Sequence, residues 1–147
     1  MGTKLFNGRF ELALRILLIL GQIRSASLEK LLAFDFIATY ASSFNLAKDN
    51  LHGVNAFNYS EIASRREMMG KSIRLLRMYN LLDVNYSGHN GYEYHLTDLG
   101  RSVERQLNDL YVTEYRQILS DVIDKYSQFS SKKLMRLIDS NLMKELG

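Results

Sequence analysis

Histidines are the first residues to test for chemistry, and the chain has three. His52 lies in a segment rich in Asn, Ser and Gly, His89 lies between two short alternating runs, and His95 lies within the second run. No cluster of His, Cys and carboxylate residues at metal-ligand spacing surrounds any of them, and the chain contains no cysteine. We therefore expect no metal site and no bound cofactor.

Catalytic motifs are also missing from the sequence. It contains no GxSxG, no phosphate-binding loop and no HExxH. The carboxylate pairs Asp121/Asp124 and Glu61/Glu67 are typical of ordinary solvated helix faces. We expect no catalytic residues and a protein that is not an enzyme. An enzyme with an unrecognised site stays open as an alternative, because active sites need not have a sequence motif.

Basic residues gather in one helical stretch and form the candidate nucleic-acid contact. In a winged helix this stretch would be the recognition helix, whose side chains reach a groove or phosphates. Without an ordered set of base-reading side chains, we expect any such contact to be nonspecific and directed to phosphate. The same residues suit an acidic protein partner, or simply a solvated face. They are Arg65, Arg66, Lys71, Arg74 and Arg77.

Tyrosines form the candidate protein interface. Tyr94 lies in an alternating run, and Tyr111 and Tyr115 lie in a later helical region. Such residues are usually in the core or at its edge, yet tyrosine also suits interfaces because it buries a large area while its hydroxyl stays wet. We expect these three to anchor a partner.

These residues must be positioned by mainly helical elements. The periodicity predicts helices over 9–20, 28–40 after a cap at Ser27, and 60–79. A long apolar-patterned region from 99 to about 129 and a short segment over 131–146 follow. The expected buried residues include Leu14, Leu17, Leu18, Phe36, Met69, Ile73, Leu76, Val84 and Leu96.

Two alternating runs predict a β-hairpin between these helices. Leu82 to Tyr86 and Tyr92 to Leu96 each present one apolar face, and the glycines between them permit a tight connection. Thr97 can cap the helix that follows. The order helix, hairpin, helix is that of a winged helix-turn-helix.

The expected fold is therefore mainly α: one winged helix-turn-helix-like domain over 1–147, with a two-stranded wing and a C-terminal helical extension from about 97 to 147. The irregular stretch 42–58 departs from the usual pattern, because DNA-reading helix-turn-helix motifs join their helices by about three or four residues. We expect it to pack back through its apolar side chains, where it could cover the reading face. These side chains are Phe44, Leu46, Leu51 and Phe57.

Composition agrees with a single soluble domain. The chain has 147 residues, of which 46% are hydrophobic and 24% charged, and a net charge of +3. That charge tolerates polyanions but does not by itself indicate nucleic-acid binding. The most apolar run, Ile16 to Leu20, is too short to span a bilayer. With no cysteine, the cytoplasm is the simplest compartment to expect.

Four segments together resemble a known family. They are ALRILLIL at 13–20, LEKLLAFDFIATYASSF at 28–44, NLHGVNAFNYSEIASRREMMGKSIRLLRMYNLL at 50–82 and YHLTDLGRSVERQLNDLYVTEY at 94–115. The chain is thereby similar to the middle components of bacterial ABC-three-component systems, which include the Lamassu-type defence modules. The most particular residues are Leu51-His52, Glu61 and the triplet Arg65-Arg66-Glu67. Gly53 stands where the family pattern has a proline.

The resemblance implies a function that the residues alone do not show. It implies a winged-helix accessory subunit that works beside an SMC/Rad50-like ATPase and an effector, often a nuclease, in defence against phage or plasmids. The alternative from the residues is a winged-helix transcription regulator that binds DNA, as a dimer through its terminal helices.

Overall fold

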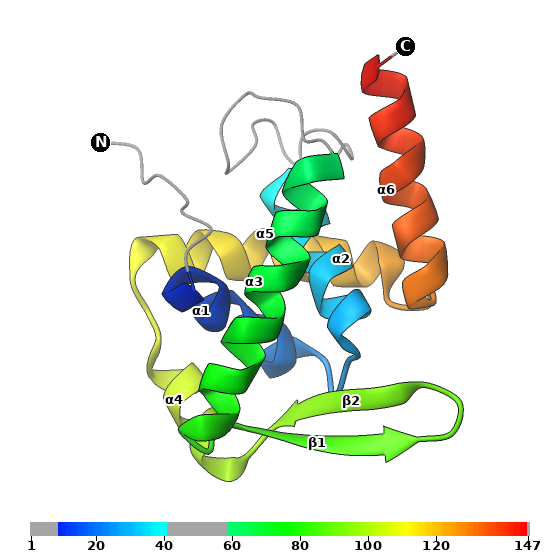
Figure 1. Cartoon of the computed structure of the whole chain (residues 1–147). Coiled ribbons are helices and arrows are strands. Elements are labelled where there is room, and N and C mark those ends of the chain that lie inside the picture. Colours follow the sequence, from blue (N-terminus) through cyan, green and yellow to red (C-terminus); the bar gives the residue numbers. More distant parts are fainter. Residues whose placement is uncertain (1–8, 41–58, 147) are drawn as a thin grey trace.

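Six α-helices and one two-stranded sheet make up the described residues, which are 9–40 and 59–146 of a computed structural model (Figure 1). The predicted packing of the stretch 42–58, together with His52, lies outside them. In chain order the elements are α1 Arg9–Gln22, α2 Leu28–Thr39, α3 Tyr59–Met78, β1 Leu82–Ser87, β2 Gly91–Leu96, α4 Asp98–Gln106, α5 Leu110–Tyr126 and α6 Ser131–Leu146.

The hairpin has the predicted strands and register. β1 and β2 are antiparallel, with Leu82 opposite Leu96 and Tyr86 opposite Tyr92. Backbone hydrogen bonds of 3.0 and 2.8 Å also join Ala26, before α2, to Tyr94 on the other side of β2. This bridge holds the connection between α1 and α2 against the wing. The arrangement is the winged-helix-like one expected, and sequence alternation could not reveal a third strand only one residue long.

Helix α1 lies at the centre of the core. It packs against α2, α3, α4 and α5, so apolar side chains are needed on nearly every side of it. It continues two residues past its predicted end at residue 20, through Gly21 to Gln22. A Cβ at Gly21 would lie 2.6 Å from the side-chain carboxyl carbon of Glu104, so the glycine leaves room for this carboxylate.

Most of the predicted core is buried, with two exceptions. Leu14 is half-buried at the edge of the core, and Val84 is half-buried because the wing projects beyond the helices that cover its base. The predicted residues that are buried are Leu17, Leu18, Phe36, Met69, Ile73, Leu76 and Leu96.

The region after the wing divides into two helices before α6. Asp109 caps α5 by accepting a hydrogen bond from the backbone N–H of Val112 at 2.8 Å. Arg116 closes the turn, because its guanidinium donates to the carbonyl oxygens of Leu107 and Glu104, both at 2.6 Å. Both α5 and α6 pack on α2, which also packs against α1 and α3 (Figure 1).

Helix α4 begins in close contact with the turn between α3 and β1. The Thr97 hydroxyl donates to the carbonyl oxygen of Asn80 at 2.6 Å and accepts from the N–H of Gly100 at 2.9 Å. A Cβ at Gly100 would lie 2.0 Å from the carbonyl oxygen of Leu81. Only a glycine permits this approach, which fixes the wing base against α4.

Candidate functional site

A buried carboxylate lies where four helices meet. Asp35 of α2 is fully buried and accepts hydrogen bonds from Arg15 Nε at 2.7 Å and Arg15 Nη2 at 3.1 Å. Arg65 Nη1 of α3 donates at 3.2 Å, and the Tyr115 hydroxyl of α5 donates at 2.7 Å. One side chain of α2 thus connects α1, α3 and α5.

Arg65 is a second centre of this buried network. It is 1% exposed and donates to Thr39 Oγ1 at 2.7 Å and to Glu61 Oε2 at 3.0 Å. Glu61 also accepts a hydrogen bond from the Tyr40 hydroxyl. The Arg65 guanidinium lies over the Phe36 ring, 4.6 Å from its centroid. The expectation that Arg65 contacts nucleic acid or a partner is therefore wrong, because its charged group is enclosed by the protein.

The burial of Arg65 has a signal in the sequence. At about 100° per residue, position 65 falls within about 60° of Ile62, on the arc that also carries Met69 and Ile73. The face assignment by itself would have placed Arg65 inward. The sequence did not reveal that Asp35, on a different helix, would accept a hydrogen bond from Arg65 inside the protein.

The charges of the network are balanced and shift the pKa of its members. Burial raises the pKa of Asp35, but Arg15 and Arg65 outweigh it, so the pKa lies below its ordinary value. Burial raises the pKa of Tyr111 to about 12 and that of Tyr115 well above its ordinary value. The carboxylate is therefore held ionised and the phenols neutral.

Two of the three predicted interface tyrosines are buried. Tyr115 is 0% exposed and Tyr111 is 9% exposed, with its hydroxyl accepting from Arg15 Nη1 at 3.4 Å. Their expected role as partner anchors is wrong, because they belong to the i, i+4 stripe by which α5 packs on the core. Tyr94 is half-buried where β2 meets Ala26, and its role in an interface stays a prediction.

Two exposed tyrosines lie instead at the far end of the wing, and a third, Tyr79, directly follows α3 and is 65% exposed. Tyr86 is 70% exposed and Tyr92 is 62% exposed. They are cross-strand partners whose rings lie edge to face, with centroids 5.1 Å apart. Alternation in the strands indicated that Tyr86 and Tyr92 share a face. They are exposed to solvent because the wing extends beyond the core.

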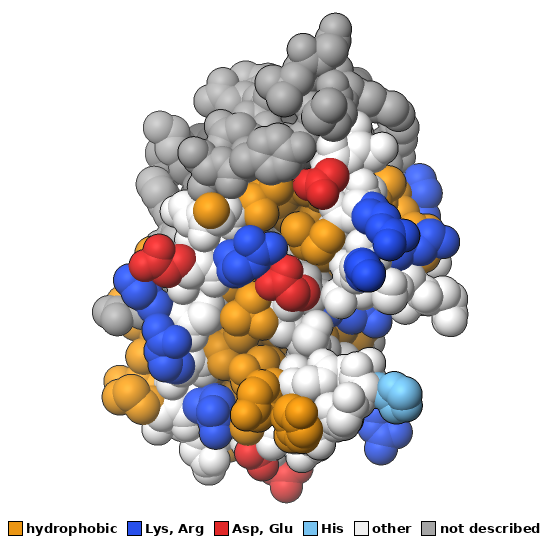
Figure 2. Space-filling model, turned by 45° about the vertical axis from the view of Figure 1, so that its right-hand side comes forward, with side chains coloured by type: hydrophobic (Ala, Val, Ile, Leu, Met, Phe, Trp, Pro, Cys, Tyr) orange, Lys and Arg blue, Asp and Glu red, His pale blue; other side chains and the backbone are white. Residues whose placement is uncertain are grey.

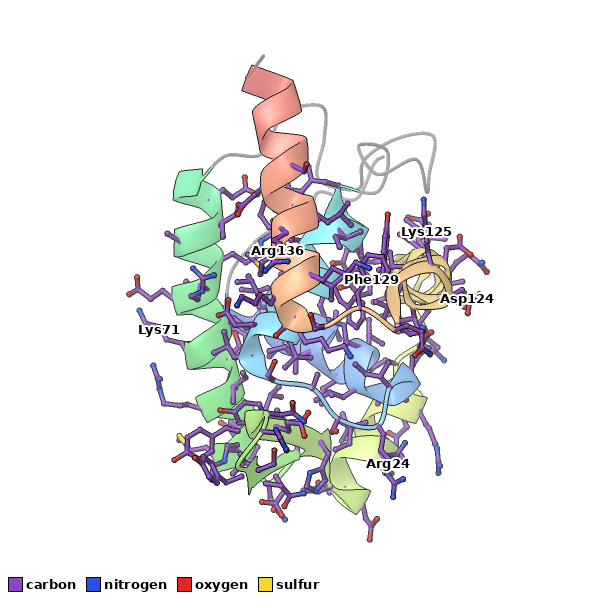
Figure 3. All side chains as sticks on the ribbon, turned by 90° about the vertical axis from the view of Figure 1, so that its right-hand side faces the viewer. Arg24, Lys71, Asp124, Lys125, Phe129 and Arg136 are labelled. Carbon is purple, nitrogen blue, oxygen red and sulfur yellow. The ribbon has the colours of Figure 1, made fainter. Side chains whose placement is uncertain are left out.

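The remaining predicted basic residues lie on the outer side of α3. Arg66 forms a two-point pair with Glu29, at 2.9 and 2.8 Å. Lys71, which projects from α3 in Figure 3, lies 3.6 Å from Glu67.

Arg74 and Arg77 differ from these residues. Both are exposed, and neither is in the ion pairs found among the described residues. They line a shallow depression together with Met78, Asn80, Leu82 and Asp83. Their contact with phosphate or an acidic partner stays a prediction.

The two described histidines lie in separate places. His95 lines a depression with Arg24 and Arg101, and His89 lies at the turn of the wing. Within residues 9–40 and 59–146, no group of three or more His, Cys, Asp and Glu side chains is placed to hold a metal ion. Nor does any helix there have the length and apolar character needed to cross a membrane.

Comparison with protein families gives one match. Residues 5–147 match the family described as "ABC-three component (ABC-3C) system Middle Component 2". No curated protein and no solved structure matches the chain. The family match therefore spans every described helix and strand.

Proposed function

Since the chain belongs to the Middle Component 2 family of ABC-3C systems, we propose that it is a non-catalytic, stoichiometric subunit of a bacterial complex that defends against phage or plasmids. Its family makes it an accessory component of a system with several parts. The proposal goes further: the chain docks on an SMC/Rad50-like ATPase in the cytoplasm, and through it on an effector, a nuclease, as in Lamassu-type modules.

The family match over residues 5–147 is the observation that carries this proposal. The buried network supports it. Arg15, Asp35 and Arg65 bond to one another and to tyrosines in the interior, so these titratable groups fix the mutual positions of helices. Meanwhile Tyr86, Tyr92, Arg74 and Arg77 are exposed on the surface. Winged helices dock on proteins as well as on DNA, so the fold is compatible with either use.

A DNA-binding regulator is the second candidate function. It is favoured by Lys71, Arg74 and Arg77, which are exposed on α3, the helix that would enter a groove. If these residues touch DNA, the binding should distinguish sequences little and weaken steeply with salt.

Coexpression with the other two components tests the proposal. We expect this chain to copurify with the ATPase in a complex of fixed stoichiometry whose interface exceeds about 1,000 Å². Deleting the chain should abolish protection. A protein that purifies alone, ignores the ATPase and leaves protection intact when deleted would rule the proposal out. Tight, sequence-selective binding to its own promoter that survives raised salt would establish the regulator instead.

A further inference from the structure

We infer that the C-terminal end of α3 and the wing form one docking surface. Its occupant is an acidic protein segment with an apolar anchor, contributed by another component of the system. This inference rests on the proposed function and specifies the surface through which it works. We call it the helix–wing surface and define it by Arg74, Arg77, Met78, Tyr86 and Tyr92.

The apolar part of this surface is continuous with the core side of the wing. Leu82 is 3% exposed and lines the same depression as Arg74, Arg77 and Met78, so the base of β1 lies beside the end of α3. Because side chains alternate along a strand, Tyr86 lies on the same face as Leu82. The sheet therefore carries one apolar face from the core out to the exposed tyrosines.

Large apolar groups are left in water on this surface. Met78 is 81% exposed, in addition to Tyr86 and Tyr92. On the face seen in Figure 2, hydrophobic side chains gather toward the lower end, where the wing lies, with Lys and Arg side chains beside them and Asp or Glu side chains below them. Exposed aromatic groups next to a basic edge are typical of a surface that is covered in an assembly.

The charge of the surface determines the chemistry of its partner. Glu29 and Glu67 neutralise Arg66 and Lys71 farther along α3. Arg74 and Arg77 remain without an ion-pair partner among the described residues, and Asp83 at the edge of the depression offsets only one of these two positive charges. Carboxylates on the partner would complement the excess.

The composition favours a protein over a nucleic acid. A nucleic-acid surface presents several phosphate-directed cations in a continuous patch. Here two arginines with no ion-pair partner among the described residues lie beside a methionine, and two tyrosines lie farther along the wing; these residue types are enriched at protein interfaces and their energetic centres. From Leu82 to Tyr86 the strand spans roughly 13 Å, so an extended segment of about five residues would reach from the arginines to the tyrosines.

Binding of purified full-length variants to the other two components, each immobilised separately, tests this inference. We expect Arg74→Glu/Arg77→Glu and Tyr86→Ala/Tyr92→Ala each to raise the Kd for one component at least tenfold. Tyr86→Phe/Tyr92→Phe should bind nearly as the wild type does, because the rings carry the contact. Raised salt should weaken the wild type more than Arg74→Gln/Arg77→Gln.

Matched controls come from other exposed positions. Lys125→Glu/Lys132→Glu makes the same change in net charge on α5 and α6, and Figure 3 shows Lys125 on the side of the molecule away from Lys71. Leu110→Ala removes an apolar side chain that is 69% exposed. Both should bind as the wild type does. Thermal melting checks that each variant folds, and Arg74→Gln/Arg77→Gln replaces the charge reversal if that one melts early.

The outcomes separate the two proposals. If the wild type binds neither component, the proposed function fails and the inference fails with it. If the wild type binds but the arginine and tyrosine variants bind equally well, the inference alone is overturned. The same holds if those variants lose only DNA binding, since the occupant of the surface would then be a nucleic acid.

Discussion

Asp35 shows how one buried side chain can organise several helices. Its carboxylate accepts hydrogen bonds from two arginines and a tyrosine that come from α1, α3 and α5. All of these donors come from helices other than α2. The hydrogen bonds therefore form only when α1, α3 and α5 are correctly placed around Asp35. Buried ion pairs add little net stability, but removing one partner leaves an uncompensated charge.

The substitution Asp35→Ala should therefore be costly. Arg15 would lose the carboxylate to which two of its guanidinium nitrogens donate, while Arg65 would keep Glu61. We expect the free energy of unfolding to fall by about 3–5 kcal/mol, measured by urea denaturation. The double variant Arg15→Met/Asp35→Leu removes both charges and should be clearly more stable than Asp35→Ala. A loss below about 1 kcal/mol for Asp35→Ala would show that this ion pair is not needed for folding.

At the scale of elements, the wing is positioned by its base. The turn between α3 and β1 is held by Thr97, by the left-handed conformation of Asn80, with φ of 61°, and by the contact of Gly100 with Leu81. The helix–wing surface depends on this joint, because it fixes the direction in which the strands leave α3. A change at the joint would move the tyrosines relative to the arginines without touching either.

Two glycine substitutions test the joint. Gly100→Ala should destabilise the protein by about 1–3 kcal/mol despite the better helix propensity of alanine, because the Leu81 carbonyl is backbone and cannot rotate away. Gly70→Ala in α3 is the control: its Cβ would have its nearest neighbours at 3.8 and 3.9 Å, an ordinary contact. That variant should be unchanged or up to about 1 kcal/mol more stable. Thermal melting measures both variants, and a higher melting temperature for Gly100→Ala than for Gly70→Ala would contradict this prediction.

At the scale of the whole molecule, the buried network makes folding stability depend on pH. The pKa of Asp35 is lowered in the folded state, so its contribution is present above its unfolded pKa and is lost as the pH falls below about 4. The pKa values of Tyr111 and Tyr115 are raised, so their contribution is present below about pH 10 and is lost as the pH rises through the folded values.

We therefore expect the free energy of unfolding to fall on both sides of a plateau. Urea denaturation between pH 2 and pH 11, at constant ionic strength, would measure it. The variant Asp35→Asn should lose most of the difference between neutral and acid pH, and Tyr115→Phe should reduce the loss at the alkaline end. If the free energy of unfolding of Asp35→Asn falls at acid pH as much as that of the wild type, other carboxylates cause the loss.

The elements of this fold follow from local patterns in the sequence. The helices over 28–39 and 59–78 lie within one residue of their predicted bounds, and the wing has its predicted register. Periodicity of apolar residues and turn chemistry act over a few residues, so the sequence alone carries them. The family resemblance was also readable there, and the match over residues 5–147 confirms it.

The positions of the polar and aromatic side chains were decided by tertiary structure. Arg65 and Tyr115 are buried because Asp35, 30 and 80 residues away in sequence, accepts their hydrogen bonds. Tyr86 and Tyr92 are exposed because the wing extends past the helices that cover its base. Burying an arginine or tyrosine is costly unless partners satisfy most of its polar atoms. That partner comes from another helix, so helical periodicity can indicate that Arg65 faces inward but cannot identify the carboxylate that allows its burial.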